Sequence, residues 1–275
     1  MRMSLWIACL ALTLPTLGTR ARSEPVTLLP GNPAIDGSFI QPYKTKWNLM
    51  GRGADGSVIQ MGVWVDSTRI DTINGREVLI RRQAWIHDKG SEGYYNIVDH
   101  KTMEPVLSQH VNSAGTYRRY EFSPNSTSVR YQQFQPDPQQ GLKAMTAPAE
   151  QGVLALQKPY FEFNCGMFGL LIAGFPLKEG YSARFPVFRS YDPKAEPAWI
   201  DFEVKGKETI SAGPYKNLET WLVVVNSPDT GEVITLNVAK VPPYVIKLRQ
   251  PWDGRDWTFD LVDVTKPQTP AKPTT

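Results

Sequence analysis

The stretch Tyr160–Leu177, YFEFNCGMFGLLIAGFPL, is the one long apolar run after the N-terminal region that does not alternate with polar residues. The segments around it are typical of strands and turns. Asn164 has the side chain of a helix N-cap, Gly174 is typical of a helix C-terminus, and Pro176 prevents a helix from continuing. The run therefore predicts a short helix of about nine residues between Asn164 and Gly174.

This predicted helix is apolar on nearly every side, so we expect it to be buried. Burial of each large side chain contributes roughly 1.5 to 3 kcal/mol, which sums to the order of ten kcal/mol. The side chains concerned are Met167, Phe168, Leu170, Leu171, Ile172 and Phe175. We expect the helix to pack against or under a sheet.

Alternating apolar and polar residues occupy most of the remaining chain. In the first such segment Tyr43, Thr45, Trp47 and Leu49 alternate with polar residues, which is the period of a strand with one wet face. Asn74-Gly75 is a strong hairpin signal between two of the segments. The other predicted strands cover residues 59–65, 78–86, 93–99, 106–111, 116–122, 128–134, 182–190, 199–211, 218–226, 232–240, 244–250 and 257–264.

The connections between these segments are mostly a few residues long, which favours antiparallel neighbours and a meander. Residues 135–177 interrupt the pattern with a linker, QPDPQQG, a turn of helix near Gln151 to Leu156, and the apolar helix. A sheet in either half would leave one face uncovered, so we predict one domain over residues 38–264. Residues 24–37 and 265–275 are Pro-rich and predicted to be loose.

The N-terminus, MRMSLWIACLALTLPTLGTRARSEP, is typical of a secretory signal peptide. Its apolar stretch is shorter than the roughly 20 residues that span a bilayer, so we expect export and no permanent anchor. Cleavage after Ala21 or after Ser23 fits the small-residue rule equally well, which makes residues 1–23 the signal peptide. Cys9 lies inside the apolar stretch, too early for a lipidated cysteine. The periplasm of a Gram-negative bacterium is the predicted location.

Removal of residues 1–23 takes away three arginines and no acidic residue, so the formal charge falls from +3 to zero. No basic excess then remains to bind nucleic acid. Cys165 would be the single cysteine left, so the exported chain would have no internal disulfide. A chain of about 250 residues can bury a sizeable core without one. Cys165 itself is predicted to be a packing residue.

Motifs for catalysis or cofactors are lacking in the sequence. His87, His100 and His110 share no ligand spacing, and nucleophile-elbow, P-loop and dinucleotide motifs do not occur. We therefore predict a protein that is not an enzyme and has no cofactor and no metal site. A hydrolase that uses Cys165 with a histidine remains an alternative. Asn125 begins a glycosylation sequon whose use depends on the organism.

Aromatic residues are plentiful, and several tryptophans fall in predicted strands, where core packing is the ordinary role of such residues. A cavity or groove lined by them is the alternative. The candidates for lining a ligand cavity are Trp47, Met61, Phe168, Leu171 and Trp221.

Several segments occur in an order that resembles an exported bacterial family of unknown function. They are IVDHKTMEPVLSQHV from Ile97, the run from Tyr160 to Phe188, FEVKGKETISAGPYKNLETWLV from Phe202, and PPYVIKLRQP from Pro242. The similarity covers roughly Tyr43 to Val262. The matching positions are Asp99, Thr102, Pro105, Pro176, Leu177, Gly180, Gly206, Glu208, Gly213, Glu219 and Trp221.

That family is similar in predicted shape to the periplasmic lipoprotein carriers of the LolA and LolB kind. The resemblance implies a strongly curved, incomplete antiparallel barrel whose open side is covered by helix and which holds acyl chains. No residue role can be carried over, because no motif matches those carriers position by position. The predicted fold is thus a mainly β half-barrel with one internal apolar helix.

The sequence leaves three functional hypotheses. The first is an exported, non-enzymatic envelope protein that binds an apolar ligand, a lipid or lipoprotein acyl chain, between sheet and helix; a pocket of this kind needs few polar groups. The second is a structural or interaction protein of the envelope with a filled core and a protein partner. The third is the hydrolase that uses Cys165.

Overall fold

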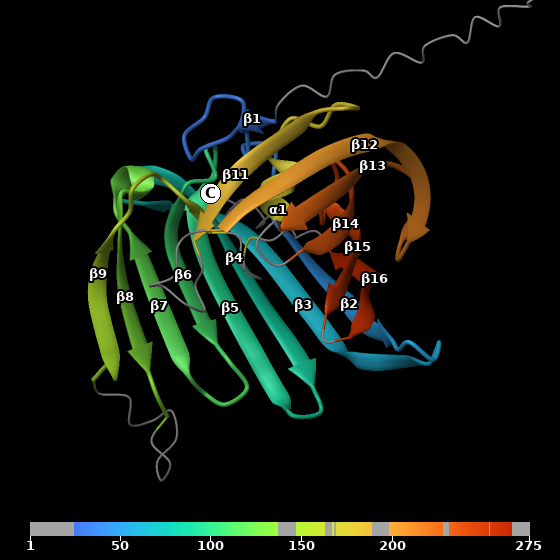
Figure 1. The fold of residues 1–275 in the computed structure, drawn as a ribbon, viewed down its shortest axis with the longest axis horizontal. Helices are drawn as coiled ribbons and strands as arrows, with labels where there is room; N and C mark the ends of the chain where they lie inside the picture. The colour runs from blue at the N-terminus through green and yellow to red at the C-terminus, as the bar shows by residue number, and fades with distance from the viewer. Residues whose placement is uncertain are drawn as a thin grey trace, which may run out of the picture.

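The computed structural model describes residues 25–136, 147–162, 167, 169–188, 198–227, 231–252 and 254–265. Sixteen strands and almost no helix make up this part of the chain (Figure 1). The first ten strands are β1 (Val26–Thr27), β2 (Tyr43–Arg52), β3 (Val58–Ile73), β4 (Arg76–His87), β5 (Gly90–Asp99), β6 (Pro105–Val111), β7 (Tyr117–Phe122), β8 (Ser128–Phe134), β9 (Glu150–Ala155) and β10 (Phe161–Glu162). The others are β11 (Ser182–Phe188), β12 (Ala198–Ala212), β13 (Tyr215–Ser227), β14 (Glu232–Val238), β15 (Val245–Trp252) and β16 (Arg255–Thr265). A 3₁₀ turn (Pro124–Ser126) and the helix α1 (Leu170–Ala173) complete the elements.

The strands form two antiparallel meanders, β2 to β9 and β11 to β16, which confirms the predicted mainly β, antiparallel class. The two meanders join where β16 pairs antiparallel with β2, for example Leu261 beside Trp47. The result is one large, curved sheet that does not close into a barrel. Figure 1 shows its two parts on either side of α1.

Two short strands depart from the predicted meander. β1 and β10 each pair parallel with β11, because the chain reaches them by long connections and not by hairpins. The predicted turn of helix near Gln151 to Leu156 is also wrong. This segment is β9, whose residues alternate between partly buried and exposed and pair with β8.

Interruptions in the ladder contribute to the curvature of the sheet. Between β2 and β3, Leu49 pairs with Gly62 and Met50 with Gln60, so Met61 is an extra residue and forms a β-bulge. Gly62 has a φ of +141°, and a Cβ there would lie 2.4 Å from the carbonyl oxygen of Ile86. A side chain does not fit, so glycine is required at this bend.

The predicted helix is much shorter than expected. α1 has four residues, a single turn that cannot cover a sheet of this size, so the prediction of a helix covering the open side is not supported. Its N-terminal neighbour Gly169 has a φ of +75°, which no helix interior adopts. The predicted N-cap, Asn164, lies outside the described residues.

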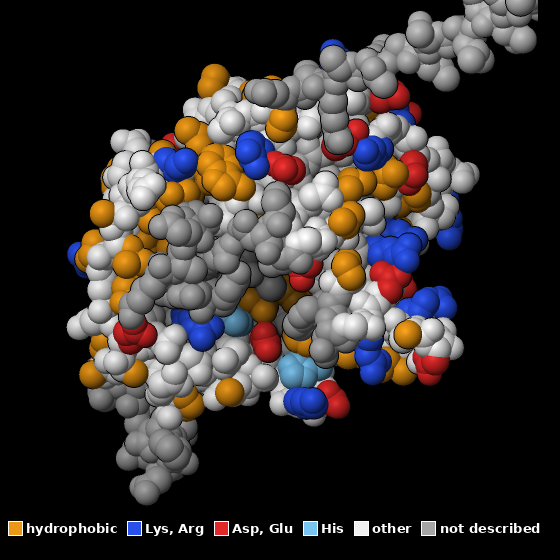
Figure 2. Space-filling view, viewed as in Figure 1, with side chains coloured by type: hydrophobic (Ala, Val, Ile, Leu, Met, Phe, Trp, Pro, Cys, Tyr) orange, Lys and Arg blue, Asp and Glu red, His pale blue; other side chains and the backbone are white. Residues whose placement is uncertain are grey.

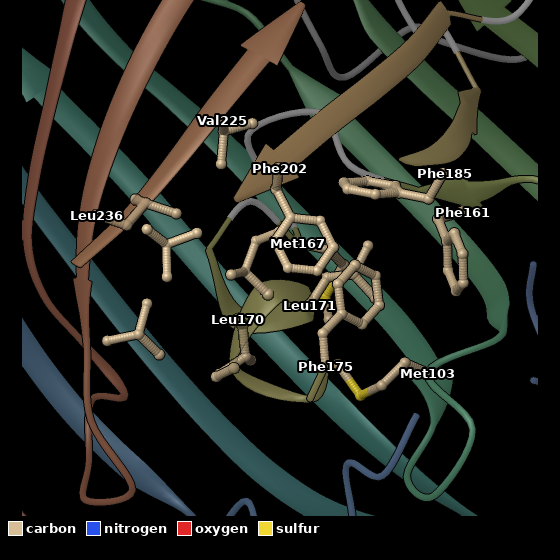
Figure 3. Close-up of a cluster of buried hydrophobic side chains, with 14 of the residues drawn as sticks. Met103, Phe161, Met167, Leu170, Leu171, Phe175, Phe185, Phe202, Val225 and Leu236 are labelled. Atoms are coloured by element: carbon tan, nitrogen blue, oxygen red, sulfur yellow. The ribbon is translucent and has the colours of Figure 1, made fainter. Parts of the chain in front are cut away.

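The apolar run is nevertheless buried as predicted. Met167 and the residues of α1 lie in the main core cluster with Phe175, and they contact side chains from both parts of the sheet (Figure 3). Phe175 packs against Phe202 of β12 at a ring distance of 5.2 Å and against Phe161 of β10 at 5.8 Å. The ammonium of Lys240 donates to the carbonyl of Ala173 at the end of α1. Burial drives this segment inward even without a long helix.

Candidate ligand-binding cavity

A cavity of about 670 Å³ lies between the two parts of the sheet. Figure 2 shows this face of the molecule hollowed, with hydrophobic side chains in the hollow and histidine and acidic side chains beside it. Strands β2 to β6 supply one wall and β11 to β16 supply the other. Side chains from eleven strands thus meet around one space.

The wall from the second meander is mostly apolar. Its strands place alternate residues on the inner face, so Ile200, Val225, Ile234 and Leu248 line the cavity together. Val245, which also belongs to this wall, packs against Gly169, where an added Cβ would lie 2.6 Å from a Val245 methyl group. The core around α1 therefore adjoins the cavity.

The wall from the first meander carries a polar row. Strand pairing sets Asp66, Gln83, Tyr94 and His110 side by side across β3, β4, β5 and β6. All four line the cavity. Polar side chains on an inner face need partners when they are buried, and their contacts follow from this register.

Asp66 and Arg81 form a buried ion pair at this wall, with side chains only 2% and 7% exposed. Arg81 Nε lies 3.1 Å from both carboxylate oxygens of Asp66, and its Nη2 lies 2.7 Å from Oδ2. The hydroxyl of Tyr43 donates to the same carboxylate at 2.9 Å. Burial, followed by the charge of Asp66, raises the pKa of Tyr43 well above its usual range, so the phenol remains a donor.

The charge of Arg81 also acts on the carboxyl of Glu162 of β10. The residue is 4% exposed, and burial raises the pKa of its carboxyl from 4.5 to about 8, against the opposing effects of Arg81 and of a hydrogen bond with Ser108. Glu162 is therefore mostly protonated at neutral pH. Because β10 pairs with β11, this side chain connects the second meander to the polar wall.

Glu92, Tyr94 and His110 form a second polar group. The hydroxyl of Tyr94 donates to Glu92 Oε2 at 2.9 Å, and His110 Nε2 lies 3.5 Å from the same oxygen without hydrogen-bond geometry. The rings of Tyr94 and His110 stack at 4.5 Å. Burial lowers the pKa of His110 although Glu92 opposes the shift, so the imidazole is neutral at pH 7.

Aromatic rings occupy the junction of the two walls. Trp64 stacks on Tyr94 at 5.5 Å and meets Phe259 edge-on at 5.9 Å. Trp85 meets Trp257 edge-on at 5.7 Å. These contacts bring residues of β3, β4, β5 and β16 into one aromatic surface in the cavity.

The predicted cavity residues have different locations. Trp47 lines the cavity, paired with Trp64 on the neighbouring strand. Leu171 lies in the main core, and Trp221 is half-buried against that core, with the ammonium of Lys207 5.2 Å from its ring. Met61 packs against the aromatic side of the cavity from the bulge. Phe168 lies outside the described residues, as does Cys165.

Most residues of the cavity were missed by sequence reasoning. Arg81 and Arg82 are adjacent in the chain, yet strand alternation turns one inward and the other outward. No characteristic spacing in the sequence links His110 with Glu92, because the two residues come from different strands. Polar residues do occur at the inner positions of β3 to β6, but only the strand register shows that they lie side by side.

Some positions that carried the resemblance are structural. The carboxylate of Asp99 accepts from the backbone and the hydroxyl of Thr102 at 2.7 and 2.9 Å, and its other oxygen contacts Arg76. These bonds hold the turn between β5 and β6. The pattern of Asp, Thr and Pro therefore describes a turn.

These features define a curved, open antiparallel sheet with an internal cavity. Residues 43–260 match the family described as "Protein of unknown function (DUF3108)", and the chain belongs to this family. No curated protein matches. One similar solved structure is the "Beta-barrel-like Protein of Domain of Unknown Function DUF1849 from Brucella abortus", with 10% identity and a TM-score of 0.46 over 84% of this chain and 100% of that one.

Within the described residues, no helix has the length and apolar character needed to cross a membrane.

Proposed function

We propose that this protein is an exported, non-enzymatic carrier that holds an apolar or amphipathic ligand, such as a lipid or the acyl part of a lipoprotein, in the cavity between the two meanders. The observation that supports the proposal best is the cavity itself. About 670 Å³ is within the range of small-molecule sites, and its lining combines a mostly apolar wall with a few polar groups. Export to the periplasm is part of the proposal and rests on the N-terminal sequence.

The cavity also distinguishes between the hypotheses. A structural envelope protein with a filled core has no need of such a space, so the cavity favours ligand binding over that alternative. The hydrolase hypothesis rests on Cys165, which lies outside the described residues.

Native mass spectrometry of the protein purified from its own host, with lipid extraction, tests the proposal. We expect an additional mass that lipid extraction removes. A mass equal to that of the chain alone under all conditions would contradict ligand carriage.

A pair of variants localises binding to the cavity. Ile234→Trp adds bulk on the cavity wall, whereas Val233→Trp adds the same bulk on the opposite face of β14, where the side chain is exposed. N-phenyl-1-naphthylamine, which fluoresces in apolar surroundings, serves as the probe. We expect Ile234→Trp to abolish most of the binding signal and Val233→Trp to retain it. Equal signals would place the probe elsewhere.

A further inference from the structure

The charged groups of the cavity lining are mostly acidic. Among the described residues that line it, Asp66, Glu92 and Glu232 carry carboxylates and Arg81 carries a guanidinium. Arg81 is held in the buried pair with Asp66, so its charge is already matched. An anionic ligand would have to break that pair to use Arg81, and breaking a buried pair is strongly unfavourable.

Glu92 is placed to meet a ligand. It lies on the polar wall with its side chain 19% exposed, and Tyr94 is the donor that orients it. The neighbouring His110 is neutral at pH 7, because burial lowers its pKa, so it does not balance the Glu92 charge. Arg118, the next residue along this row, donates to Gln133 and does not line the cavity.

Aromatic rings lie close to this carboxylate. Trp64 stacks on Tyr94, whose hydroxyl contacts Glu92, and Trp85 pairs directly with Glu92 across β4 and β5. The faces of such rings carry negative electrostatic potential and attract cations. A carboxylate beside the indole rings of Trp64 and Trp85 is a combination that recognises ammonium groups.

We propose that the ligand is an amphiphile with a cationic head group, which lies at Glu92 and the rings of Trp64 and Trp85. Its apolar tail lies along Ile200, Val225 and Ile234 on the opposite wall. The inference rests on the proposed function and adds the charge of the ligand to it.

Three probes with the same tail test the head group. Dodecyltrimethylammonium is cationic, dodecyl sulfate is anionic and dodecyl maltoside is neutral, and each is titrated below its critical micelle concentration by calorimetry at pH 7. We expect the cationic probe to bind about tenfold more tightly than the neutral one, and the anionic probe to bind more weakly than both.

Variants of Glu92 show whether the preference arises at this site. Glu92→Gln keeps the size and removes the charge, and we expect the advantage of the cationic probe to fall to about threefold or less while the neutral probe binds as before. Glu92→Asp keeps the charge and retains the preference. Glu121→Gln removes a carboxylate that does not line the cavity and serves as the control.

The outcomes separate the two proposals. Binding of the neutral probe without a cationic preference, or with an anionic one, overturns the head-group assignment and leaves ligand carriage standing. A cationic preference that survives Glu92→Gln, or is lost in Glu121→Gln, also overturns it. Failure of all three probes to bind overturns both proposals.

Discussion

The guanidinium of Arg81 donates hydrogen bonds to the carboxylate of Asp66 at the wall of the cavity. Its Nε lies 3.1 Å from both oxygens, and its Nη2 lies 2.7 Å from one of them. The two residues lie on neighbouring strands and are almost completely buried. Removal of either partner leaves the charge of the other buried without compensation.

Arg81→Met should therefore destabilise the protein by about 3 to 5 kcal/mol, because the carboxylate of Asp66 stays buried without its cation. Urea unfolding monitored by tryptophan fluorescence measures the change. Arg82→Met is the matched control, since Arg82 is the next residue, exposed on the outer face, and should change stability by less than about 1 kcal/mol. Equal losses for the two variants would contradict this role of the pair.

The buried carboxyl of Glu162 should make the stability of the folded protein depend on pH. Its carboxyl has a pKa of about 8 in the folded protein and an ordinary value of 4.5, so between these values the folded protein holds a proton that the unfolded chain has released. Stability should then fall as pH rises through this window, by at most about 1.4 kcal/mol per pH unit. Below pH 4.5 the carboxyl is protonated in the folded and the unfolded protein, so Glu162 no longer makes stability depend on pH.

The test compares the wild type with Glu162→Gln by urea unfolding at pH 5, 6, 7 and 8. We expect the variant to gain stability relative to the wild type as pH increases, because glutamine carries no charge to bury. Parallel profiles for the two proteins would rule out Glu162 as the titrating group.

The bulge has no room for a side chain at position 62, so we expect it to require glycine there. Gly62→Ala should cost roughly 2 to 4 kcal/mol, because the new Cβ meets the Ile86 carbonyl and the residue holds a positive φ. Gly56 also has a positive φ, +82°, but nothing lies within 4 Å of its Cβ position, so Gly56→Ala should cost about 1 kcal/mol. Thermal unfolding of both variants separates backbone strain from the collision. A smaller loss at Gly62 than at Gly56 would be inconsistent with the geometry.

The apolar run predicts a large cost for truncation inside the core. Leu171→Ala should destabilise the protein by about 2 to 5 kcal/mol, because Leu171 is 1% exposed and surrounded by the main core. Val153→Ala, on an exposed position of β9, should be within about 0.5 kcal/mol of the wild type. Chemical denaturation of the two variants provides the comparison. A neutral Leu171→Ala would mean that the run is not part of the core.

Local patterns were sufficient to predict most strands. Alternation from Tyr43 to Leu49 matches β2, and Asn74-Gly75 forms the predicted hairpin turn with both residues at positive φ. The same reasoning failed where local signals were weak. β9 was predicted as a turn of helix because its strand identity depends on pairing with β8, which lies across a long connection.

Local sequence patterns are enough to specify that this chain forms an antiparallel sheet and that the run from Tyr160 to Leu177 is buried. These properties depend on periodicity and hydrophobicity, which are local. The cavity and the grouping of its residues depend on tertiary contacts. The pairing of β16 with β2 unites the two meanders, and the register then brings Glu92, His110 and the tryptophans to one cavity. Contacts between distant strands depend on the geometry of the whole sheet, which no single segment encodes.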